Sequence, residues 1–188
     1  MGLFTIIGRR LGAAVCLLVF CATATVADDL PWSLGGRIVV TAVSDGDTIR
    51  SGQLRIRLHG IDAPERQQHC TTTEGARWAC GTAARDALKT LVASVAALDC
   101  QMTDVDRYGR LVMRCFAGDV DVGATLVRAG MALAYRRYAD DYITDEEAAR
   151  AARSGLWAGQ FDAPWDWRRS KQRRRTPAKY QLKNTKLA

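Results

Sequence analysis

The sequence predicts an α+β fold dominated by a five-stranded barrel of the OB type and decorated by about three helices. Five short segments rich in β-branched and apolar residues carry strand patterns, and a helical pattern lies between the third and the fourth of them. Glycines stand at turn positions around the first three segments, as expected for strands joined by tight turns. An open α+β sheet would fit the same order of elements, and the pattern alone does not choose between the two.

The first three strands are expected at residues 37–43, 47–51 and 54–59. In the third strand, apolar residues at alternate positions are separated by Arg55, Arg57 and His59. A period of two sends one set of side chains into the core and the other set to the opposite face. We therefore expect the apolar residues in the core and Arg57 on the polar face, where it can balance acids or contact an anionic substrate.

Helices and two more strands make up the rest of the folded domain. The expected elements are a helix at 82–96, strands near 98–103 and 110–117, and a short helix beginning at Asp121. The last helix is predicted to begin at a capping box formed by residues 144–147 and to stop at Gly155. The tryptophan-containing segments at 156–157 and 164–167 are expected to pack back onto the domain.

The first 27 residues have the order of a secretory signal peptide. Arg9 and Arg10 form a positive start, an apolar run covers 11–22, and small residues at 25–27 supply a cleavage site after Ala27. The apolar run is short for a membrane-spanning helix, which weakens the alternative of an uncleaved anchor. The protein is therefore expected to be exported to the periplasm or secreted, without a membrane span after cleavage.

Charge is distributed unevenly along the remainder of the chain. Residues 168–188 contain nine Lys or Arg and no acid, so residues 28–167 carry a net charge of −4 within the formal +7 of the whole chain. We therefore expect a short N-terminal lead at 28–35, a folded domain at 36–167 and a basic, disordered tail at 168–188. A tail of this composition either stays solvated or serves as an arm for phosphate groups.

Four cysteines follow the expected cleavage site: Cys70, Cys80, Cys100 and Cys115. An even number in an exported chain favours disulfides, and four cysteines allow three connectivities. Cys100 and Cys115 lie nearly symmetrically about the turn-like residues 106–109, where cross-strand partners would have Cβ atoms roughly 4.5–5.5 Å apart. Cys70 and Cys80 would then close the loop between them. A zinc site is a weaker interpretation, because the sequence has no C-x-x-C pair and only two histidines.

Carboxylates are concentrated in two short motifs, D-G-D-T at 45–48 and D-A-P-E at 62–65. Carboxylate oxygens are hard ligands suited to calcium or magnesium. Gly46 permits the tight turn that presents Asp47, and the proline of the second motif keeps that segment extended, so that its two acids can face a common space. Either motif alone would fit a solvated turn, as would D-R-Y-G-R at 106–110, but their combination favours a functional site.

With these motifs in this order, the chain resembles the thermonuclease family of staphylococcal-nuclease-like proteins. The resemblance runs from about Gly36 to Trp157, through D-G-D-T at 45–48, R-L-H-G-I-D-A-P-E at 57–65, D-R-Y-G-R at 106–110 and G-L-W at 155–157. Separated motifs in a fixed order make it specific. The resemblance implies a calcium-dependent nuclease that hydrolyses the phosphodiester bonds of DNA or RNA.

The resemblance also assigns roles to individual residues. Asp47 and Asp62 would ligate Ca²⁺ together with the backbone carbonyl of Ala63. Glu65 would act as the general base or would orient the attacking water. The implied phosphate-binding and charge-stabilising residues are Arg57 and Arg110, and the implied substrate-pocket residues are Arg107, Tyr108, Tyr135 and Tyr138. These roles agree with physical chemistry, because guanidinium groups match phosphate oxygens and a metal ion polarises a phosphate.

Two alternatives belong to other functional classes. The first is a non-catalytic OB-type module that binds nucleic acid without cutting it, and such a module would be expected to lack some of the acids and arginines that this chain retains. The second is an interaction protein whose basic tail binds anionic polymers. DNA or RNA is the expected partner, and the chain is expected to be a monomer with no stable protein partner.

Overall fold

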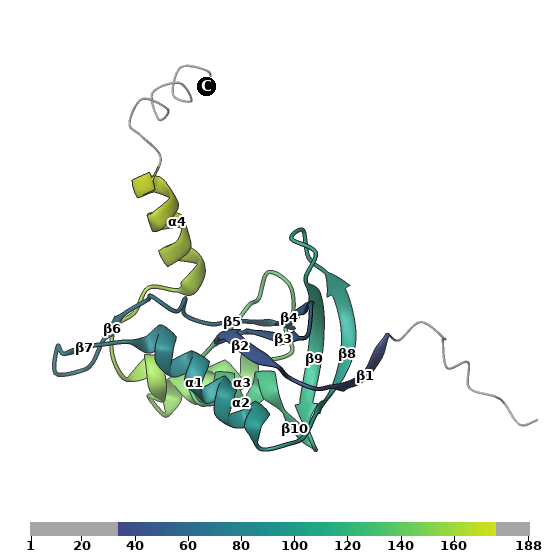
Figure 1. Cartoon of the computed structure of the whole chain (residues 1–188). Helices are drawn as coiled ribbons and strands as arrows, with labels where there is room; N and C mark the ends of the chain where they lie inside the picture. Colours follow the sequence, from purple (N-terminus) through teal and green to yellow (C-terminus); the bar gives the residue numbers. More distant parts are fainter. Residues whose placement is uncertain (1–33, 176–188) are drawn as a thin grey trace, which may run out of the picture. The chain divides into compact units, whose positions relative to one another are not determined.

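Six strands form the curled path of the main sheet in the computed structural model, which describes residues 34–175 (Figure 1). Their order along the path is β1-β8-β9-β4-β3-β2, and a seventh short strand, β10, pairs with β9. The pair β4–β9 is parallel and the other pairs are antiparallel. The strands are β1 (Gly35–Ile38), β2 (Ala42–Asp45), β3 (Thr48–Ser51), β4 (Leu54–Leu58), β8 (Leu98–Val105), β9 (Leu111–Ala117) and β10 (Val120–Asp121).

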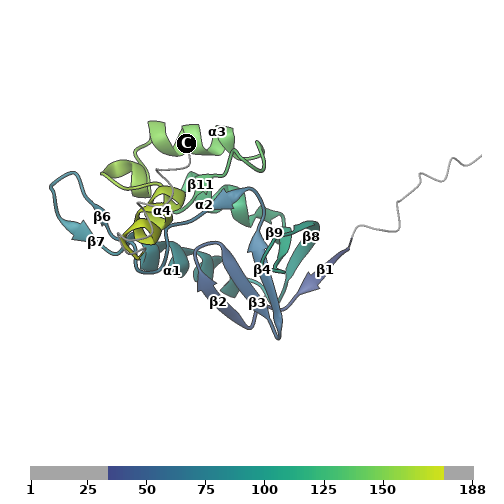
Figure 2. The same cartoon turned by 90° about the horizontal axis from the view of Figure 1, so that it is seen from above.

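Two further pairs of short strands and a set of helices complete the described part of the chain. The paired strands are β5 (Ile61–Asp62) with β11 (Leu133–Ala134), and β6 (Cys70–Thr71) with β7 (Arg77–Trp78). The helices are α1 (Cys80–Ala93), α2 (Val122–Arg128), α3 (Ile143–Ala151), the short 3-10 helix η1 (Gly155–Ala158) and α4 (Pro164–Arg175). Strand β5 follows β4 directly and pairs with β11, which leads to α3 on the helical side of the fold (Figure 2).

The predicted α+β fold with an OB-type barrel is confirmed, and the sheet curls into a half-barrel. The strand expected at 37–43 is two strands, of which β1 pairs with β8 at one end of the path and β2 pairs with β3 at the other end. Only three residues separate β1 from β2 in the chain. Because one short segment supplies both outer strands, the two ends of the path are held close together and the sheet has to curl.

The core joins the sheet to helices α1 and α2. Ile56 and Leu58 of β4 are buried as the alternation predicts, and they pack in one cluster with Leu88 of α1 and Leu126 of α2. Leu54 was expected in the same set but is 50% exposed, because it lies beside the turn that joins β3 to β4. Burying a leucine or isoleucine side chain fully contributes about 1.5–3 kcal/mol, so this cluster is the main support of the barrel.

Both disulfides pair as the hairpin argument predicts. Cys100 and Cys115 are directly opposed in the β8–β9 register, with their Cα atoms 4.1 Å apart. Cys70 of β6 bridges to Cys80, the first residue of α1, across a Cα–Cα distance of 5.7 Å. The second bridge therefore fastens the loop that follows Glu65 to the beginning of a core helix.

Helix α3 does not begin at the predicted capping box. Its N-cap is Tyr142, which makes no side-chain capping bond, and the residues 144–147 lie within the helix. The tyrosine ring is 2% exposed, and its hydroxyl donates to the Asp121 carboxylate at 3.2 Å. Because burial of Tyr142 fixes the chain at this point, the helix starts directly after it, and packing rather than capping sets the boundary.

The same helix ends at Ala151, before the predicted stop at Gly155. Arg153 adopts φ 53°, in the left-handed region, and the backbone N–H of Ser154 donates to the carbonyl of Ala149 at 2.9 Å. This closure resembles the helix ends that normally place glycine in the left-handed position. An arginine therefore occupies the position that glycine would favour, and Gly155 begins η1 instead.

Helix α4 crosses the predicted boundary between the domain and the tail at residue 168. Pro164 is buried at the start of the helix, and Trp165 stacks on Tyr135 with ring centroids 5.5 Å apart and an interplanar angle of 1°. These contacts anchor the start of the helix. From there it extends to residue 175, into the segment expected to be a disordered tail. The remainder of that tail, the predicted signal peptide at 1–27 and most of the lead at 28–35 lie outside the described residues. Within 34–175, no helix has the length and apolarity needed to cross a membrane.

Candidate active site

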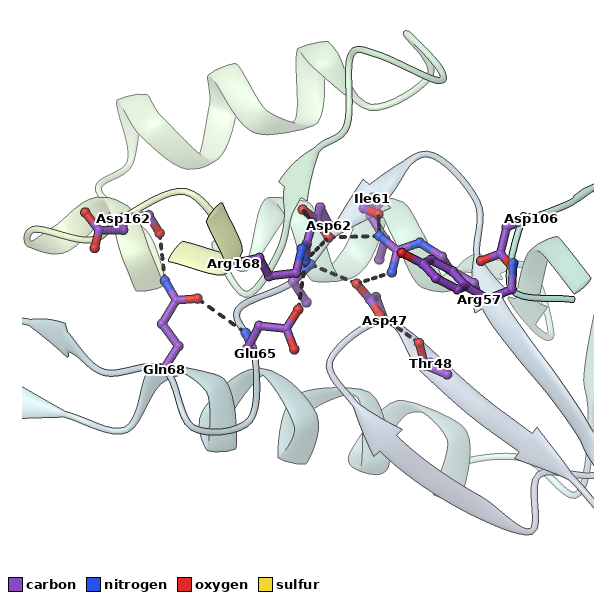
Figure 3. Close-up of polar contacts among 12 residues, drawn as sticks. Asp47, Thr48, Arg57, Ile61, Asp62, Glu65, Gln68, Asp106, Asp162 and Arg168 are labelled. Carbon is purple, nitrogen blue, oxygen red and sulfur yellow. Dashed lines mark hydrogen bonds and ion pairs between the residues drawn. The ribbon is translucent and has the colours of Figure 1, made fainter. Parts of the chain in front are cut away.

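The two acidic motifs of the sequence meet at a single arginine (Figure 3). Arg57, on β4, directs Nη1 to the Asp47 carboxylate at 2.9 Å and Nη2 to the Asp62 carboxylate at 2.8 Å. The same Nη2 also donates to the backbone carbonyl of Ile61 at 3.2 Å. One guanidinium thus binds two carboxylates from different parts of the chain and a backbone carbonyl beside the second of them.

Local geometry explains how these residues come together. Asp47 lies in the turn between β2 and β3, and Thr48 stands opposite Arg57 in the β3–β4 register. Gly46 allows this turn to lie against the rest of the fold, because a Cβ atom there would be 2.7 Å from the Cβ of Ala63 and 2.8 Å from that of Ala84. The glycine of D-G-D-T is therefore needed for close packing, in addition to the turn.

The Asp47 carboxylate is held by two further hydrogen bonds. The hydroxyl of Thr48 donates to Oδ1 at 2.8 Å, and the backbone N–H of Ala63 donates to Oδ2 at 3.2 Å. Asp47 is 5% exposed and Asp62 is fully buried. Buried carboxylates with this many partners are fixed in orientation. The backbone of Ala63, the residue predicted to supply a carbonyl ligand, contacts the carboxylate of Asp47.

Arg168 of helix α4 is the second guanidinium of the site, and the sequence argument did not identify it. Its Nη2 donates to Oδ2 of Asp62 at 2.7 Å, and its Nη1 donates to Oδ1 of Asp62 at 3.0 Å and to the Glu65 carboxylate at 2.8 Å. The residue fell in the segment interpreted as a solvated tail. The tryptophans at positions 165 and 167 were the signal that the chain was still packed at this point.

Burial and mutual repulsion perturb the acids of this cluster. Burial raises the pKa of Asp62, while the hydrogen bond from Arg168 opposes the rise. Burial, followed by the neighbouring carboxylates of Asp47 and Glu65, raises the pKa of Asp45 to about 6. Burial acts to lower the pKa of Arg57, but the two aspartates that it contacts outweigh this and raise it. Arg57 therefore stays charged, and the acids outnumber the bases in the cluster.

Asp45 is a second residue of interest that the sequence argument mentioned only as part of its motif. Its Oδ1 is buried and, among the described residues, it has no hydrogen-bond partner. An unpaired buried carboxylate oxygen is costly, and a nearby cation is one way to satisfy it. Within residues 34–175, however, no three His, Cys, Asp or Glu side chains converge closely enough to hold a metal ion by themselves, so backbone carbonyls or water would have to complete a coordination shell.

Arg110 reaches the cluster from the turn between β8 and β9. Its guanidinium pairs with the Asp106 carboxylate at 2.7 Å, and its Nη1 lies 3.4 Å from the hydroxyl of Thr48. The backbone N–H groups of Tyr108 and Arg110 both donate to Oδ1 of Asp106, at 2.9 and 3.0 Å. Asp106 thus builds the turn and aims Arg110, whereas Arg107 and Tyr108 lie exposed on its outer side with their side chains in contact.

Tyr135 lines a cleft of about 610 Å³, whereas Tyr138 is not among the residues that line it. The two rings meet edge to face with centroids 4.8 Å apart, and Tyr138 is 66% exposed. The cleft wall includes β11, whose Leu133 stands opposite Asp62 in the β5–β11 register. Aromatic and cationic side chains line the cleft: Tyr135, Trp157, Phe161, Trp165, Arg136, Arg137, Arg150 and Arg169.

Comparison with known proteins gives a consistent result. A protein-family model described as Staphylococcal nuclease homologue matches residues 55–159. The succinoglycan biosynthesis protein ExoI of Rhizobium meliloti (strain 1021) is 31% identical over 156 residues, which cover 81% of this chain and 77% of that protein. An uncharacterized endonuclease of Escherichia coli O157:H7 is 36% identical over 144 residues, covering 72% and 86%. The probable staphylococcal-like nuclease CAN2 of Oryza sativa subsp. japonica is 30% identical over 135 residues, covering 70% of this chain and 34% of that protein.

Proposed function

The chain belongs to the staphylococcal nuclease homologue family, and we propose that it is a calcium-dependent nuclease that hydrolyses phosphodiester bonds of DNA or RNA. The family and the nuclease and endonuclease relatives support this reaction and a nucleic-acid substrate. The observation that carries the proposal is the guanidinium of Arg57 held between the buried carboxylates of Asp47 and Asp62. The rival assignment, a non-catalytic module that only binds nucleic acid, does not require this set of charged groups, so their presence favours the enzyme.

The donors of the cluster fit a divalent cation. Four carboxylates face two guanidinium groups, and an oxygen of Asp45 is buried without a partner among the described residues. Ca²⁺ would be held by Asp47, Asp62 and the backbone carbonyl of Ala63, all of which are hard oxygen ligands. When bound, a cation of this kind polarises a phosphate and makes a coordinated water more acidic.

Glu65 is the acid that can meet a water molecule. Its side chain is 33% exposed, whereas that of Asp62 is fully buried. Its backbone N–H donates to the side chain of Gln68 at 3.3 Å, which fixes the main chain beside the carboxylate. We assign Glu65 the role of accepting a proton from the attacking water, or of orienting that water toward the phosphorus atom.

Arg57 and Arg110 are assigned to the phosphate. Arg57 directs three donors at Asp47, Asp62 and a backbone carbonyl, and a guanidinium has five donors in all, so two can serve a phosphate oxygen. Arg110 is aimed by Asp106 and already lies beside Thr48. Preorganised donors of this kind stabilise charge that develops in the transition state, and loss of one typically costs about 10²–10³ in rate.

The neighbouring nucleotides of the substrate are assigned to the aromatic surfaces on either side of the cluster. Bases stack on aromatic side chains with about 1–3 kcal/mol per base, and arginines accompany the phosphates. Tyr135 lines the cleft and Tyr138 packs against Tyr135, while β11 of the cleft wall pairs with the strand that carries Asp62. Arg107 and Tyr108 offer a second, exposed contact near Arg110.

Export is part of the proposal. The two disulfides support an oxidising compartment, because structural disulfides are rare where thiols are kept reduced. The segment 1–27, interpreted as a signal peptide, would deliver the chain to that compartment. The periplasm and the extracellular space would both satisfy this condition, and the substrate in either is free DNA or RNA.

Hydrolysis assays on the oxidised protein test the function. Single-stranded DNA and RNA are incubated with Ca²⁺, with Mg²⁺ and with a chelator, beside the variants Glu65→Gln and Arg57→Ala. Arg55→Ala is the matched control, since Arg55 lies on the same strand and is exposed. We expect calcium-dependent cleavage that falls at least about 10²-fold in the first two variants and is unchanged in the control. Folded protein that binds the oligonucleotides without cutting them would support the binding module instead.

A further inference from the structure

We propose that helix α4 is a latch that competes with the metal ion: Arg168 acts as an internal cation on Asp62 and Glu65, and a divalent cation has to displace it in order to bind. The inference rests on the proposed function in one respect, the assignment of Asp62 as a metal ligand. It adds a regulatory element that lies outside the residues matched to the family, since Arg168 follows residue 159.

The contacts of Arg168 use the oxygens that a metal ion would need. Oδ2 of Asp62 accepts from Arg168 at 2.7 Å, and Oδ1 accepts from both Arg168 and Arg57, at 3.0 and 2.8 Å. The two oxygens of a carboxylate offer about four acceptor positions, and guanidinium groups take three of them here. A cation bound to the same carboxylate would also stand beside the positive charge of Arg168, so metal and Arg168 compete for Asp62.

Glu65 is held by the same group. Nη1 of Arg168 bridges the carboxylates of Asp62 and Glu65, with 2.8 Å to the latter. In this arrangement Glu65 is neutralised by an ion pair and turned toward the helix. Release of Arg168 would therefore free a metal ligand and the proposed water-activating acid in one movement.

Helix α4 is built to hold Arg168 without burying it. The helix is fixed at its beginning, where Pro164 is buried and Trp165 stacks on Tyr135. The chain just before it is anchored by the hydrogen bond from Gln68 to the carbonyl of Asp162. Beyond that point the residues are mostly exposed, and the Arg168 side chain itself is 33% exposed. A partly solvated guanidinium beyond the anchored first residues of the helix can leave Asp62 and Glu65 without unfolding the core.

A purely structural role for Arg168 makes the opposite prediction for metal affinity. If Arg168 only positions Asp62 and Glu65, its removal would disorder these acids and weaken cation binding. If it competes, its removal leaves the same acids with less positive charge beside them, and cation binding strengthens. The sign of the change in affinity therefore separates the two roles, and it does so without an activity measurement.

The experiment is a calorimetric titration of the oxidised full chain with CaCl₂. It compares the unchanged protein, Arg168→Gln and the control Arg169→Gln, since the neighbouring Arg169 is exposed and pairs with Asp166 on its own helix. Because Ca²⁺ no longer has to displace the charge-assisted hydrogen bonds of Arg168, we expect it to bind Arg168→Gln about tenfold or more tightly than the unchanged protein. Arg169→Gln is expected to match the unchanged protein.

A second variant keeps Arg168 but weakens the latch. Trp165→Ala removes the ring that stacks on Tyr135, and the latch requires this variant also to bind Ca²⁺ more tightly than the unchanged protein.

Weaker or unchanged binding in Arg168→Gln, with the fold intact by circular dichroism, would overturn the latch. No binding to any of the four proteins would overturn it as well. Tight binding by Arg168→Gln without hydrolysis would leave the latch standing and refute the proposed nuclease activity.

Discussion

The side-chain amide of Gln68 donates a hydrogen bond of 2.7 Å to the backbone carbonyl of Asp162, which lies 94 residues further along the chain. The same side chain accepts from the backbone N–H of Glu65 at 3.3 Å, and Gln68 is fully buried. One glutamine thus connects the loop that carries Glu65 to the segment that leads into α4. The connection helps to position Glu65, the proposed water-activating acid, and it holds the start of α4 near that loop.

Replacing Gln68 by leucine is expected to destabilise the protein and to slow hydrolysis. The change removes the partners of two part-buried backbone groups, and each such hydrogen bond contributes about 1 kcal/mol. Urea denaturation measures the loss of stability, and initial rates measure the loss of activity. Gln67→Leu, at an exposed neighbouring position, is the control; equal stability of the two variants would contradict the role given to Gln68.

Arg57→Met is expected to lower the free energy of unfolding by about 3–5 kcal/mol, because removing one partner of a buried ion pair leaves the other uncompensated. The side chain of Arg57 is 15% exposed and those of Asp47 and Asp62 are 6% and 0% exposed. Added Ca²⁺ should restore part of the stability by supplying positive charge to the same acids. Chemical denaturation with and without Ca²⁺ makes the comparison, and Arg55→Met should stay within about 0.5 kcal/mol of the unchanged protein.

The two disulfides are expected to differ in their effect on activity. Removing either bridge, as Cys70→Ser with Cys80→Ser or Cys100→Ser with Cys115→Ser, should cost about 3 kcal/mol by the loop-closure argument. The first pair also releases the loop after Glu65 from α1, so kcat should fall. The second pair links strands that are already hydrogen-bonded, so kcat should persist at a temperature where the variant is folded. Equal kcat values in the two double variants would argue against a role for the Cys70–Cys80 bridge in placing Glu65.

Arg153→Gly is expected to stabilise the protein. Arg153 has φ 53° at the end of α3, a conformation that glycine adopts at little cost and other residues do not. The gain should be about 0.5–1 kcal/mol, which a shift in the thermal unfolding midpoint would register. Ala148→Gly, at an exposed position inside the same helix, should destabilise by a comparable amount, and a gain in that variant would refute the backbone argument.

The sequence was most informative where functional residues are close together in the chain. Asp47, Arg57 and Asp62 follow one another through a tight turn and a short strand, so period-two alternation and turn chemistry were enough to place Arg57 on the polar side of its strand. The same patterns predicted an α+β fold with an OB-type barrel, although they also fitted an open sheet. The division of one expected strand into β1 and β2 could not be predicted locally, because it depends on which partners the chain meets at the two ends of the sheet.

Long-range contacts explain the other differences. Arg168 is more than a hundred residues from its partners, and a basic composition gives no sign that one arginine of a run will be held by Asp62 and Glu65. The predicted capping box was outweighed by the burial of Tyr142, which is a property of the assembled core. Gln68 has no distinguishing sequence signal, since its importance comes from a carbonyl contributed by a distant segment.

The outer strands of the sheet have a consequence for how the protein behaves in concentrated solution. β1 and β2 are each four residues long, so either edge offers an incoming strand few free backbone groups for pairing. On β2, Arg85 of α1 donates to the carbonyl of Val43 at 3.2 Å, so a side chain already occupies one of these acceptors. Sheet extension between molecules is thereby discouraged at both ends, and we expect the protein to resist aggregation and to stay monomeric when concentrated.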